Sequence, residues 1–177
     1  MNRHELAAAI YRTSHLTGEF YLRSGAVSNH YFDKYRFEGD PRLLAAVVDA
    51  LKDLIPTDTE VLAGLELGGV PLVTMLSQVT GLPAIFVRKA AKPYGTQRLA
   101  EGGDIADRQL LLVEDVVTSG GQVLESARAL RGLSAHVSTA VCVVDREAGG
   151  RESLEADGIQ LHSLFRMKEL TGSTALV

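Results

Sequence analysis

Residues 109–124, which read QLLLVEDVVTSGGQVL, join side chains that could do chemistry to an apolar run that must be buried. Two adjacent carboxylates, Glu114 and Asp115, follow the apolar residues, and the small residues 118–121 come next. A loop of small residues that leads into a helix exposes N–H groups at the positive end of the helix dipole, where a phosphate binds. Carboxylates would repel that phosphate, so we expect them to accept hydrogen bonds from sugar hydroxyls. The pattern therefore indicates a ribose phosphate, although an acidic turn that caps a helix would share much of it.

Two other phosphate-binding loops are excluded. Residues 64–69 read GLELGG and have the glycine spacing of a P-loop, but Val and Pro follow where Lys and Ser or Thr are required. The sequence contains no G-x-G-x-x-G, so the dinucleotide-binding fingerprint is absent.

A basic loop is the second candidate. Arg88, Lys89, Lys92 and Arg98 fall in a stretch with no acidic residue before Glu101, within a chain of net charge -4. A long loop with several glycines is often an active-site lid, and cations on a lid suit a polyanion such as pyrophosphate. The alternative is a basic loop that is merely solvated.

Arg146 is the third candidate, because it follows Asp145 directly after the apolar run AVCVV. A guanidinium at the end of a strand can form a forked pair with a carboxylate. The residues alone leave open whether that carboxylate belongs to a substrate or to the protein.

These side chains must be positioned by strands that alternate with helices. Apolar runs at 60–66, 83–89, 109–115, 136–147 and 159–167 predict strands, and residues 68–81, 121–132 and 149–158 predict helices. Such alternation implies right-handed crossovers and a mostly parallel sheet flanked by helices. Ligands bind outside the carboxyl ends of such strands, which is where the three candidates lie. We expect one polar loop from Ala90 to Asp107.

The first part of the chain reads differently. Residues 2–16 predict a short amphipathic helix, and the aromatic-rich residues 18–37 predict a strand pair around a turn at Ser24 and Gly25. Residues 39–55 predict a helix with Asp40 as its N-cap and a proline at its first position.

The bulk composition limits the class of protein. The net charge of -4 and the pI near 5.7 argue against general nucleic-acid binding, which needs a basic face. One cysteine, Cys142, cannot form a disulfide within the chain and is expected in the core. The sequence has neither a signal-peptide pattern nor an apolar run long enough to span a membrane, so we expect a cytoplasmic protein without membrane or nucleic-acid partners.

The motif at 110–121 resembles the diphosphoribosyl-binding motif of the type I phosphoribosyltransferases: an apolar strand, two acidic residues, two variable residues and Thr-Ser-Gly-Gly. The chain is similar, over nearly its whole length, to the members that act on orotate, which share the segments GGVP, VRKAAKPYG and VVDRE. The resemblance implies the α/β fold of that family as a single domain over residues 1–177. A small N-terminal hood would cover residues 1–38 and the core residues 39–177.

The resemblance also implies a reaction. Orotate and 5-phosphoribosyl 1-diphosphate would give orotidine 5'-phosphate and pyrophosphate in pyrimidine synthesis. Mg²⁺ would be held mainly by the substrate, and a homodimer would share its lid loops between subunits. The implied catalytic residues are Lys92, Glu114 and Asp115. The implied orotate-binding residues are Arg23, Thr118 and Arg146. The implied sugar-diphosphate-binding residues are Arg88, Lys89, Lys92, Tyr94, Glu114, Asp115, Val116, Val117, Thr118, Ser119, Gly120, Gly121 and Gln122.

The chain departs from the family pattern in two places. Arg23 stands before the Ser-Gly turn where many members have Lys, and the lid has Tyr94 where many have His. A tyrosine with an ordinary pKa of about 10 is a poor acid near neutral pH, which leaves the lid's proton donor open. The alternatives are a phosphoribosyltransferase for another base, which would not need Arg146, and a non-catalytic nucleotide-sensing regulator, which should show a basic face.

Overall fold

A mostly parallel sheet forms the centre of the protein, as the alternation of strands and helices predicts. The structure, a computed structural model, describes residues 1–22, 25–91 and 98–173. In this part of the chain a six-stranded sheet has the order β5-β4-β3-β6-β7-β8. All its neighbouring pairs are parallel except β4 and β5, which are antiparallel. The strands are β3 (Val61–Leu65), β4 (Ala84–Val87), β5 (Ala100–Glu101), β6 (Gln109–Val117), β7 (His136–Asp145) and β8 (Gln160–Arg166).

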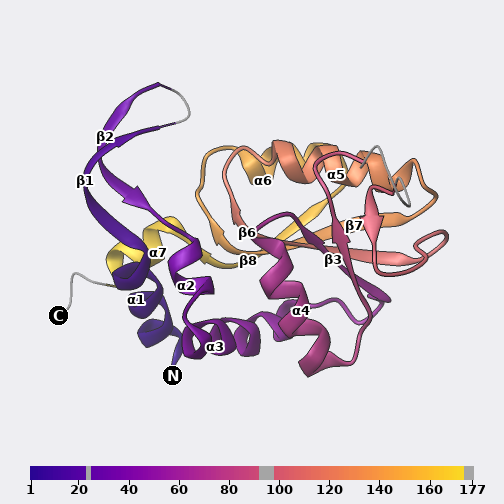
Figure 1. Cartoon of the computed structure of the whole chain (residues 1–177), viewed down its shortest axis with the longest axis horizontal. Helices are drawn as coiled ribbons and strands as arrows, with labels where there is room; N and C mark the ends of the chain where they lie inside the picture. Colours follow the sequence, from indigo (N-terminus) through magenta and orange to yellow (C-terminus); the bar gives the residue numbers. More distant parts are fainter. Residues whose placement is uncertain (23–24, 92–97, 174–177) are drawn as a thin grey trace.

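Helices cover both faces of this sheet (Figure 1). The helices α5 (Gly121–Arg131) and α6 (Gly150–Ala156) lie on one face, and α3 (Pro41–Leu51) and α4 (Gly69–Thr80) lie on the other. Helix α3 has Asp40 as its predicted N-cap, whose side chain accepts from the N–H groups of Arg42 and Leu43, and it runs into a short 3₁₀ helix, η1 (Lys52–Leu54). No helix in the described ranges is long and apolar enough to cross a membrane.

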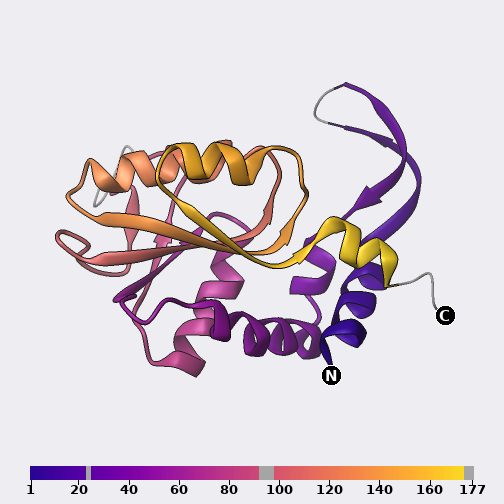
Figure 2. The same cartoon turned by 180° about the vertical axis from the view of Figure 1, so that it is seen from behind.

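The first part of the chain forms a separate feature beside the sheet, with an antiparallel hairpin that projects away from the rest (Figures 1 and 2). It consists of α1 (Arg3–Ser14), β1 (His15–Tyr21), β2 (Val27–Phe32) and α2 (Tyr35–Glu38). The last helix, α7 (Met167–Gly172), contacts α1. We call residues 1–38 the hood. Its predicted boundary with the core, at residue 38, stays a prediction.

The central strand β6 sends alternate side chains to two hydrophobic cores. Leu111 and Val113 pack in the core that includes α1, α3 and α4, whereas Leu110 and Leu112 pack in the core that includes α5 and α6. Because side chains in a strand alternate between faces, the next two residues along β6 also start on opposite faces of the sheet. Cys142 is fully buried in the second core, as the sequence predicts.

Several predicted boundaries are wrong. Strand β6 continues to Val117 instead of ending at the acidic pair, because residues 116 and 117 pair with Val144 and Asp145 of β7. The expected loop from Ala90 to Asp107 contains strand β5, which pairs with the edge of β4. The first helix ends at Ser14, and the short helices α2 and α7 were not expected.

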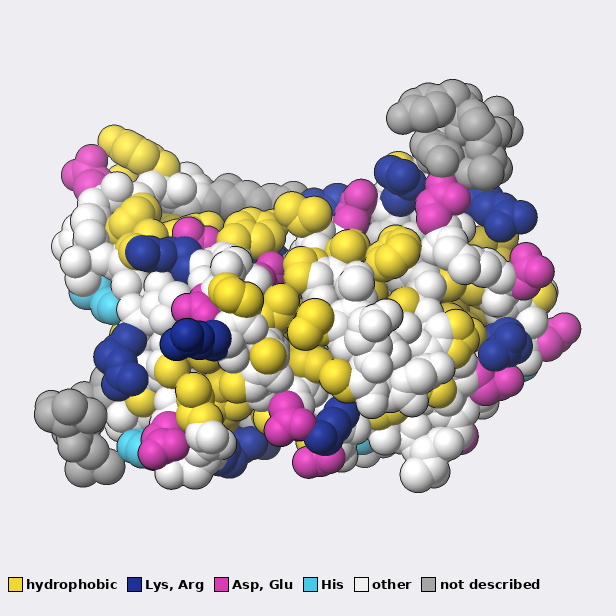
Figure 3. Space-filling view, turned by 60° about the horizontal axis from the view of Figure 1, so that its bottom comes forward, with side chains coloured by type: hydrophobic (Ala, Val, Ile, Leu, Met, Phe, Trp, Pro, Cys, Tyr) yellow, Lys and Arg dark blue, Asp and Glu magenta, His cyan; other side chains and the backbone are white. Residues whose placement is uncertain are grey.

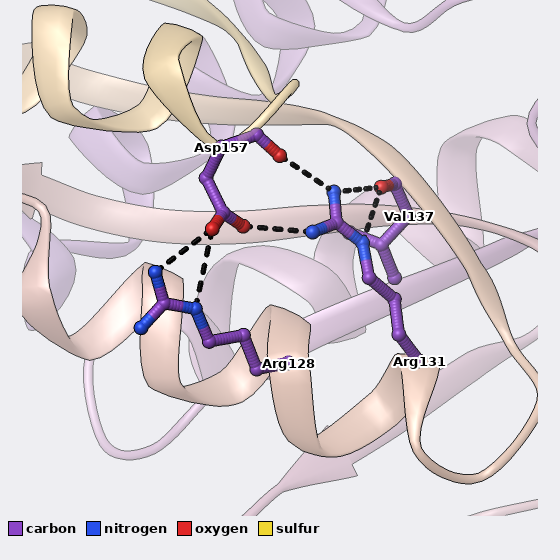
Figure 4. Close-up of polar contacts among 4 residues, drawn as sticks. All are labelled: Arg128, Arg131, Val137 and Asp157. Atoms are coloured by element: carbon purple, nitrogen blue, oxygen red, sulfur yellow. Dashed lines mark hydrogen bonds and ion pairs between the residues drawn. The ribbon is translucent and has the colours of Figure 1, made fainter.

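One carboxylate ties α5 to the end of α6. Asp157 accepts hydrogen bonds from Arg128 at 2.8 Å and from Arg131 at 2.7 Å (Figure 4). Arg131 also donates to the backbone oxygens of Val137 and Asp157. These bonds fix the far end of α5 to the end of α6 and to β7.

Candidate active site

The loop between β6 and α5 lines a cavity of about 210 Å³. Gly120 has φ +79 and is the N-cap of α5, so the N–H groups of the first helical turn are directed toward the loop. A helix start of this kind can bind an anion, and the phosphate assigned to it from the sequence stays a prediction. The lining residues are Glu114, Val116, Val117, Thr118, Ser119, Gly120, Gly121, Gln122 and Val123. The structure thus brings together the predicted sugar-diphosphate residues of this stretch, with Asp115 as the exception.

The loop keeps its shape because α6 packs against it closely. A Cβ atom on Gly150 would lie 2.5 Å from the backbone oxygen of Thr118 and 2.7 Å from Val117 Cγ1. A Cβ atom on Gly120 would lie 3.1 Å from the backbone oxygen of Gly150. The two glycines therefore permit an approach of the two helix starts that larger residues would prevent.

The two adjacent carboxylates occupy different surroundings. Glu114 lines the cavity beside the loop between β6 and α5, and it accepts a hydrogen bond from the Asp115 backbone N–H. Asp115 lies against Gly68, at the start of α4, where an added Cβ would stand 1.7 Å from its Oδ2. Its side chain also meets Lys34 of the hood, whose Nζ is 2.9 Å from Oδ1 and 2.7 Å from Oδ2. The pair therefore does not form one acidic surface at the end of a strand.

Glu38, one turn after Lys34 in the hood, completes a buried acidic cluster. Its Oε1 has no hydrogen-bond partner within the described residues. Burial, and then the nearby Asp115, raise the pKa of Glu38 to about 9. Burial, and then a hydrogen bond with Asp115, raise the pKa of Glu114 well above its ordinary value. Burial acts to lower the pKa of Lys34, but the attraction of Asp115 and Glu114 outweighs it and raises that pKa.

A second cavity, of about 280 Å³, lies between Arg146 and the hood. Arg146 is exposed, and its guanidinium has no carboxylate partner within the described residues. The neighbouring Asp145 pairs with Arg151 at 3.0 Å instead. An unpaired guanidinium beside aromatic rings suits a flat ligand that carries a carboxylate. The other lining residues are Tyr11, His15, His30, Tyr31, Phe32, Met167 and Thr171.

The base of the predicted lid is joined to the loop before α4. Glu66 accepts a hydrogen bond from the Lys89 backbone N–H at 2.6 Å, and Arg88 follows directly after β4. The side chain of Arg88 lies 3.8 Å from Glu101. The predicted site residues Lys92 and Tyr94, and the predicted orotate residue Arg23, lie outside the described residues.

The comparisons with known proteins agree with this geometry. Residues 37–161 match the model of the family described as "Phosphoribosyl transferase domain". An orotate phosphoribosyltransferase from Nocardioides sp. is 49% identical over 165 residues, which cover 93% of this chain and 92% of that protein. The chain belongs to the orotate phosphoribosyltransferase family.

Two further members show the same relation. The orotate phosphoribosyltransferase of Methanocella arvoryzae is 45% identical, with 88% of this chain and 89% of that protein covered. The crystal structure of Mycobacterium tuberculosis orotate phosphoribosyltransferase in complex with 5-phospho-alpha-D-ribosyl 1-diphosphate has a TM-score of 0.82 at 30% identity. It covers 96% of this chain and 98% of that chain.

In this chain the motif predicted the residues of the loop between β6 and α5, but it did not predict that hood residues lie beside Asp115. Lys34 and Glu38 stand in the segment DKYRFE, whose charges are the available signal, yet nothing local shows that they reach β6. His15 and His30 are far apart in the sequence, but their side chains lie together in the hood. His15 Nε2 is 3.1 Å from His30 Nδ1. Each of these residues depends on how the hood folds onto the core.

Proposed function

We propose that this protein transfers the 5-phosphoribosyl group of 5-phosphoribosyl 1-diphosphate to orotate and releases pyrophosphate, a step of pyrimidine synthesis. The observation that carries the proposal is the pairing of two cavities. One is a phosphate loop at the start of α5, and the other is an aromatic cavity that contains the exposed Arg146. The first suits the ribose phosphate, and the second suits a planar base with a carboxylate.

The residues act mainly by position and charge. The backbone N–H groups after Thr118 hold the 5'-phosphate, and Glu114 and Asp115 accept from the ribose hydroxyls. Loss of pyrophosphate leaves positive charge on C1 and the ring oxygen of the ribose, which nearby carboxylates stabilise. Thr118 and Arg146 orient orotate so that its N1 attacks C1 from the opposite side. Arg23 is proposed as a further orotate contact.

Cations from the lid act on the leaving group. Arg88, Lys89 and Lys92 are proposed to pair with the departing pyrophosphate, and Tyr94 to donate a hydrogen bond to it. The positions of Arg88 and Lys89, directly after β4 at the edge of the site, support this role. Lys92 and Tyr94 stay predictions from the family resemblance.

Mg²⁺ fits this site as an ion held mainly by substrate oxygens. Within the described ranges, no group of three or more His, Cys, Asp or Glu side chains is arranged to hold a metal by itself. Glu114 lines the cavity proposed for the ribose phosphate, and its side chain would offer a hard oxygen of the kind that Mg²⁺ prefers beside the substrate oxygens that hold the ion. When bound, the ion would neutralise charge on the diphosphate.

We also propose a cytoplasmic homodimer in which the lid of one subunit reaches the site of the other. Exposed apolar side chains on the hood support the existence of a partner surface. They include Tyr21 at 78% exposure, Val27 at 55% and Tyr31 at 45%. A second copy of this chain would cover such a surface in a symmetric enzyme.

The decisive experiment is an assay of the purified protein with orotate, 5-phosphoribosyl 1-diphosphate and Mg²⁺. We expect the absorbance of orotate to fall as orotidine 5'-phosphate forms. Parallel reactions with uracil, hypoxanthine and adenine test the alternative bases. Turnover with one of these and none with orotate would refute the proposed substrate, and turnover with none of the bases would favour the regulator.

A further inference from the structure

Asp115 is not accessible in the structure to the ligand that it is proposed to bind. Its side chain is 0% exposed, and it does not line the phosphate cavity to which Glu114 contributes. A ribose hydroxyl must come within about 3 Å of a carboxylate oxygen to donate a hydrogen bond. Some group that now covers Asp115 must therefore move before the ribose can reach it.

Lys34 is the covering group best placed to move. Its side chain is 32% exposed, whereas Glu38 is 8% exposed, Glu114 is 7% exposed and Gly68 is buried. Of these neighbours, Lys34 therefore lies on the solvent side of the carboxylate. A lysine side chain has a long and flexible stem, so it can leave without disturbing the backbone.

Asp115 cannot turn away to make room for both partners. Lys34 Nζ lies 2.9 Å from Oδ1 and 2.7 Å from Oδ2, and Oδ1 also accepts from the Val116 backbone N–H at 2.6 Å. Gly68 closes the side facing α4, because even a Cβ atom there would lie 1.7 Å from Oδ2. The ammonium and the ribose hydroxyls thus need the same face of the carboxylate.

We propose that Lys34 occupies, in the free protein, the place on Asp115 that the ribose hydroxyls take in the complex. Binding of the sugar diphosphate then expels the ammonium of Lys34 from this carboxylate. The inference rests on the proposed function, because it takes Asp115 to be a ribose ligand. It makes Lys34 a positioning residue that links the hood to occupation of the sugar site.

A double-mutant cycle tests the competition. The affinity for 5-phosphoribosyl 1-diphosphate with Mg²⁺ is measured by calorimetry for the wild type, Lys34→Met, Asp115→Asn and the double variant. If the wild type must break the ion pair to bind, the loss of that pair offsets part of the binding free energy that Asp115 gains from the ribose. Asp115→Asn should then weaken binding about tenfold more in the Lys34→Met background than in the wild type. Lys34→Met also removes a positive charge near the anionic ligand. That general effect is the same with Asp or Asn at position 115, so it cancels in the cycle.

The sign of the coupling separates competition from simple support. If Lys34 only holds Asp115 in place, Asp115→Asn costs the same or less in the Lys34→Met background, and the proposal is refuted. Lys52→Met is the matched control, because Lys52 pairs with Asp49 on the surface of α3 and η1. It should leave the effect of Asp115→Asn unchanged.

A crystal structure of the wild type with the sugar diphosphate decides the question if Lys34→Met does not fold. We expect Lys34 Nζ more than about 4 Å from both oxygens of Asp115, with ribose hydroxyls in its place. An ion pair retained beside a bound ribose would overturn the proposal. The orotate assay keeps the two proposals apart: binding without orotate turnover refutes only the base, and a wild type that does not bind the sugar diphosphate refutes both.

Discussion

At the scale of single residues, the last residue of β7 and the residue that follows it have different surroundings, which the sequence leaves open. Asp145 is 2% exposed, accepts from Arg151 and belongs to the structure. Arg146, one position later, is exposed in the aromatic cavity with no carboxylate of its own within the described part. This arrangement supports the proposal that Arg146 binds the carboxylate of a ligand.

Arg146→Ala should raise the KM for orotate roughly tenfold or more, because it removes a charge-assisted pair, and leave the KM for the sugar diphosphate within about twofold. Steady-state kinetics with each substrate varied in turn measures both values. Arg108→Ala is the control. Arg108 pairs with Glu60 just before the start of β6, whereas Arg146 follows the end of the neighbouring strand β7. Equal changes in the two KM values would contradict the role of Arg146.

Glu38 predicts a pH dependence of stability. Its pKa in the folded protein is about 9, against an ordinary 4.5, so the folded state keeps a proton that the unfolded state releases between these values. The stability is therefore fully present below about pH 4.5 and falls as the pH rises toward 9. Glu38→Gln keeps a neutral side chain at every pH and should remove this loss, which amounts to roughly 1 kcal/mol per pH unit.

Urea unfolding of the wild type and Glu38→Gln at pH 5, 7 and 8.5 measures the difference. The variant should gain stability relative to the wild type as the pH rises. Glu125→Gln, on the exposed face of α5, is the control, and its free energy of unfolding should change with pH in the same way as that of the wild type. Parallel curves for Glu38→Gln and the wild type would show that Glu38 is ionised in the folded protein.

At the scale of elements, the phosphate loop depends on the contact between the starts of α5 and α6. The loop supplies the N–H groups. Gly150, the first residue of α6, has no side chain and so lets α6 pack closely against the backbone of the loop at Thr118. The ties from Asp157 to Arg128 and Arg131 hold the other ends of the same helices. The two helices therefore contact each other at both ends, beside the loop that we propose to bind the phosphate.

Gly150→Ala should disturb this support, because its Cβ would lie 2.5 Å from the Thr118 backbone oxygen. The loop must shift, and we expect the affinity for the sugar diphosphate to fall about tenfold and the stability by about 1–3 kcal/mol. Calorimetry and thermal unfolding measure the two effects. Gly172→Ala in α7, where an added Cβ meets nothing within 4 Å, should change neither. Unchanged binding in Gly150→Ala would show that the loop tolerates the shift.

The elements also show what could be predicted from the sequence. The alternating strands and the loop between β6 and α5 could be predicted because hydrophobic period and motif are local signals. A strand end is also a local signal, and it marked Arg146 as a candidate whose role stays a prediction. The position of Asp115 was not, because the sequence suggested a strand that stops at the acidic pair, whereas β6 continues to Val117. Lys34 reaches β6 across 81 positions, and no local pattern encodes such a contact.

At the scale of the whole molecule, the hood and the segment predicted to form the lid belong to different parts of the chain, and the hood lines the cavity that contains Arg146. Figure 3 shows hydrophobic side chains on the hood, at the left, and others across the adjoining face. The exposed apolar residues of the hood include Tyr21, Leu22, Val27 and Tyr31. Such a surface suits a second copy, which would bring a second lid close to each site.

A shared lid predicts complementation between two variants that each turn over slowly at an orotate concentration well below the KM of Arg146→Ala. Lys92→Ala damages the lid, and Arg146→Ala damages the base cavity. If each lid serves the neighbouring site, a mixed dimer contains one site with an intact lid and an intact cavity. Random exchange in an equal mixture should then restore about a quarter of the wild-type sites. If each lid serves its own subunit, every site in the mixed dimer keeps one defect and no activity returns.

The experiment co-expresses the two variants with different tags, so that mixed dimers can be purified and assayed with orotate and the sugar diphosphate. Sedimentation should give a mass near twice 19.0 kDa for the wild type. The control combines Lys92→Ala with Lys92→Ala under both tags, which should stay slow because no intact lid is present. Activity in the mixed dimer alone identifies a lid that crosses the interface, whereas a wild type that sediments as a monomer contradicts the shared site.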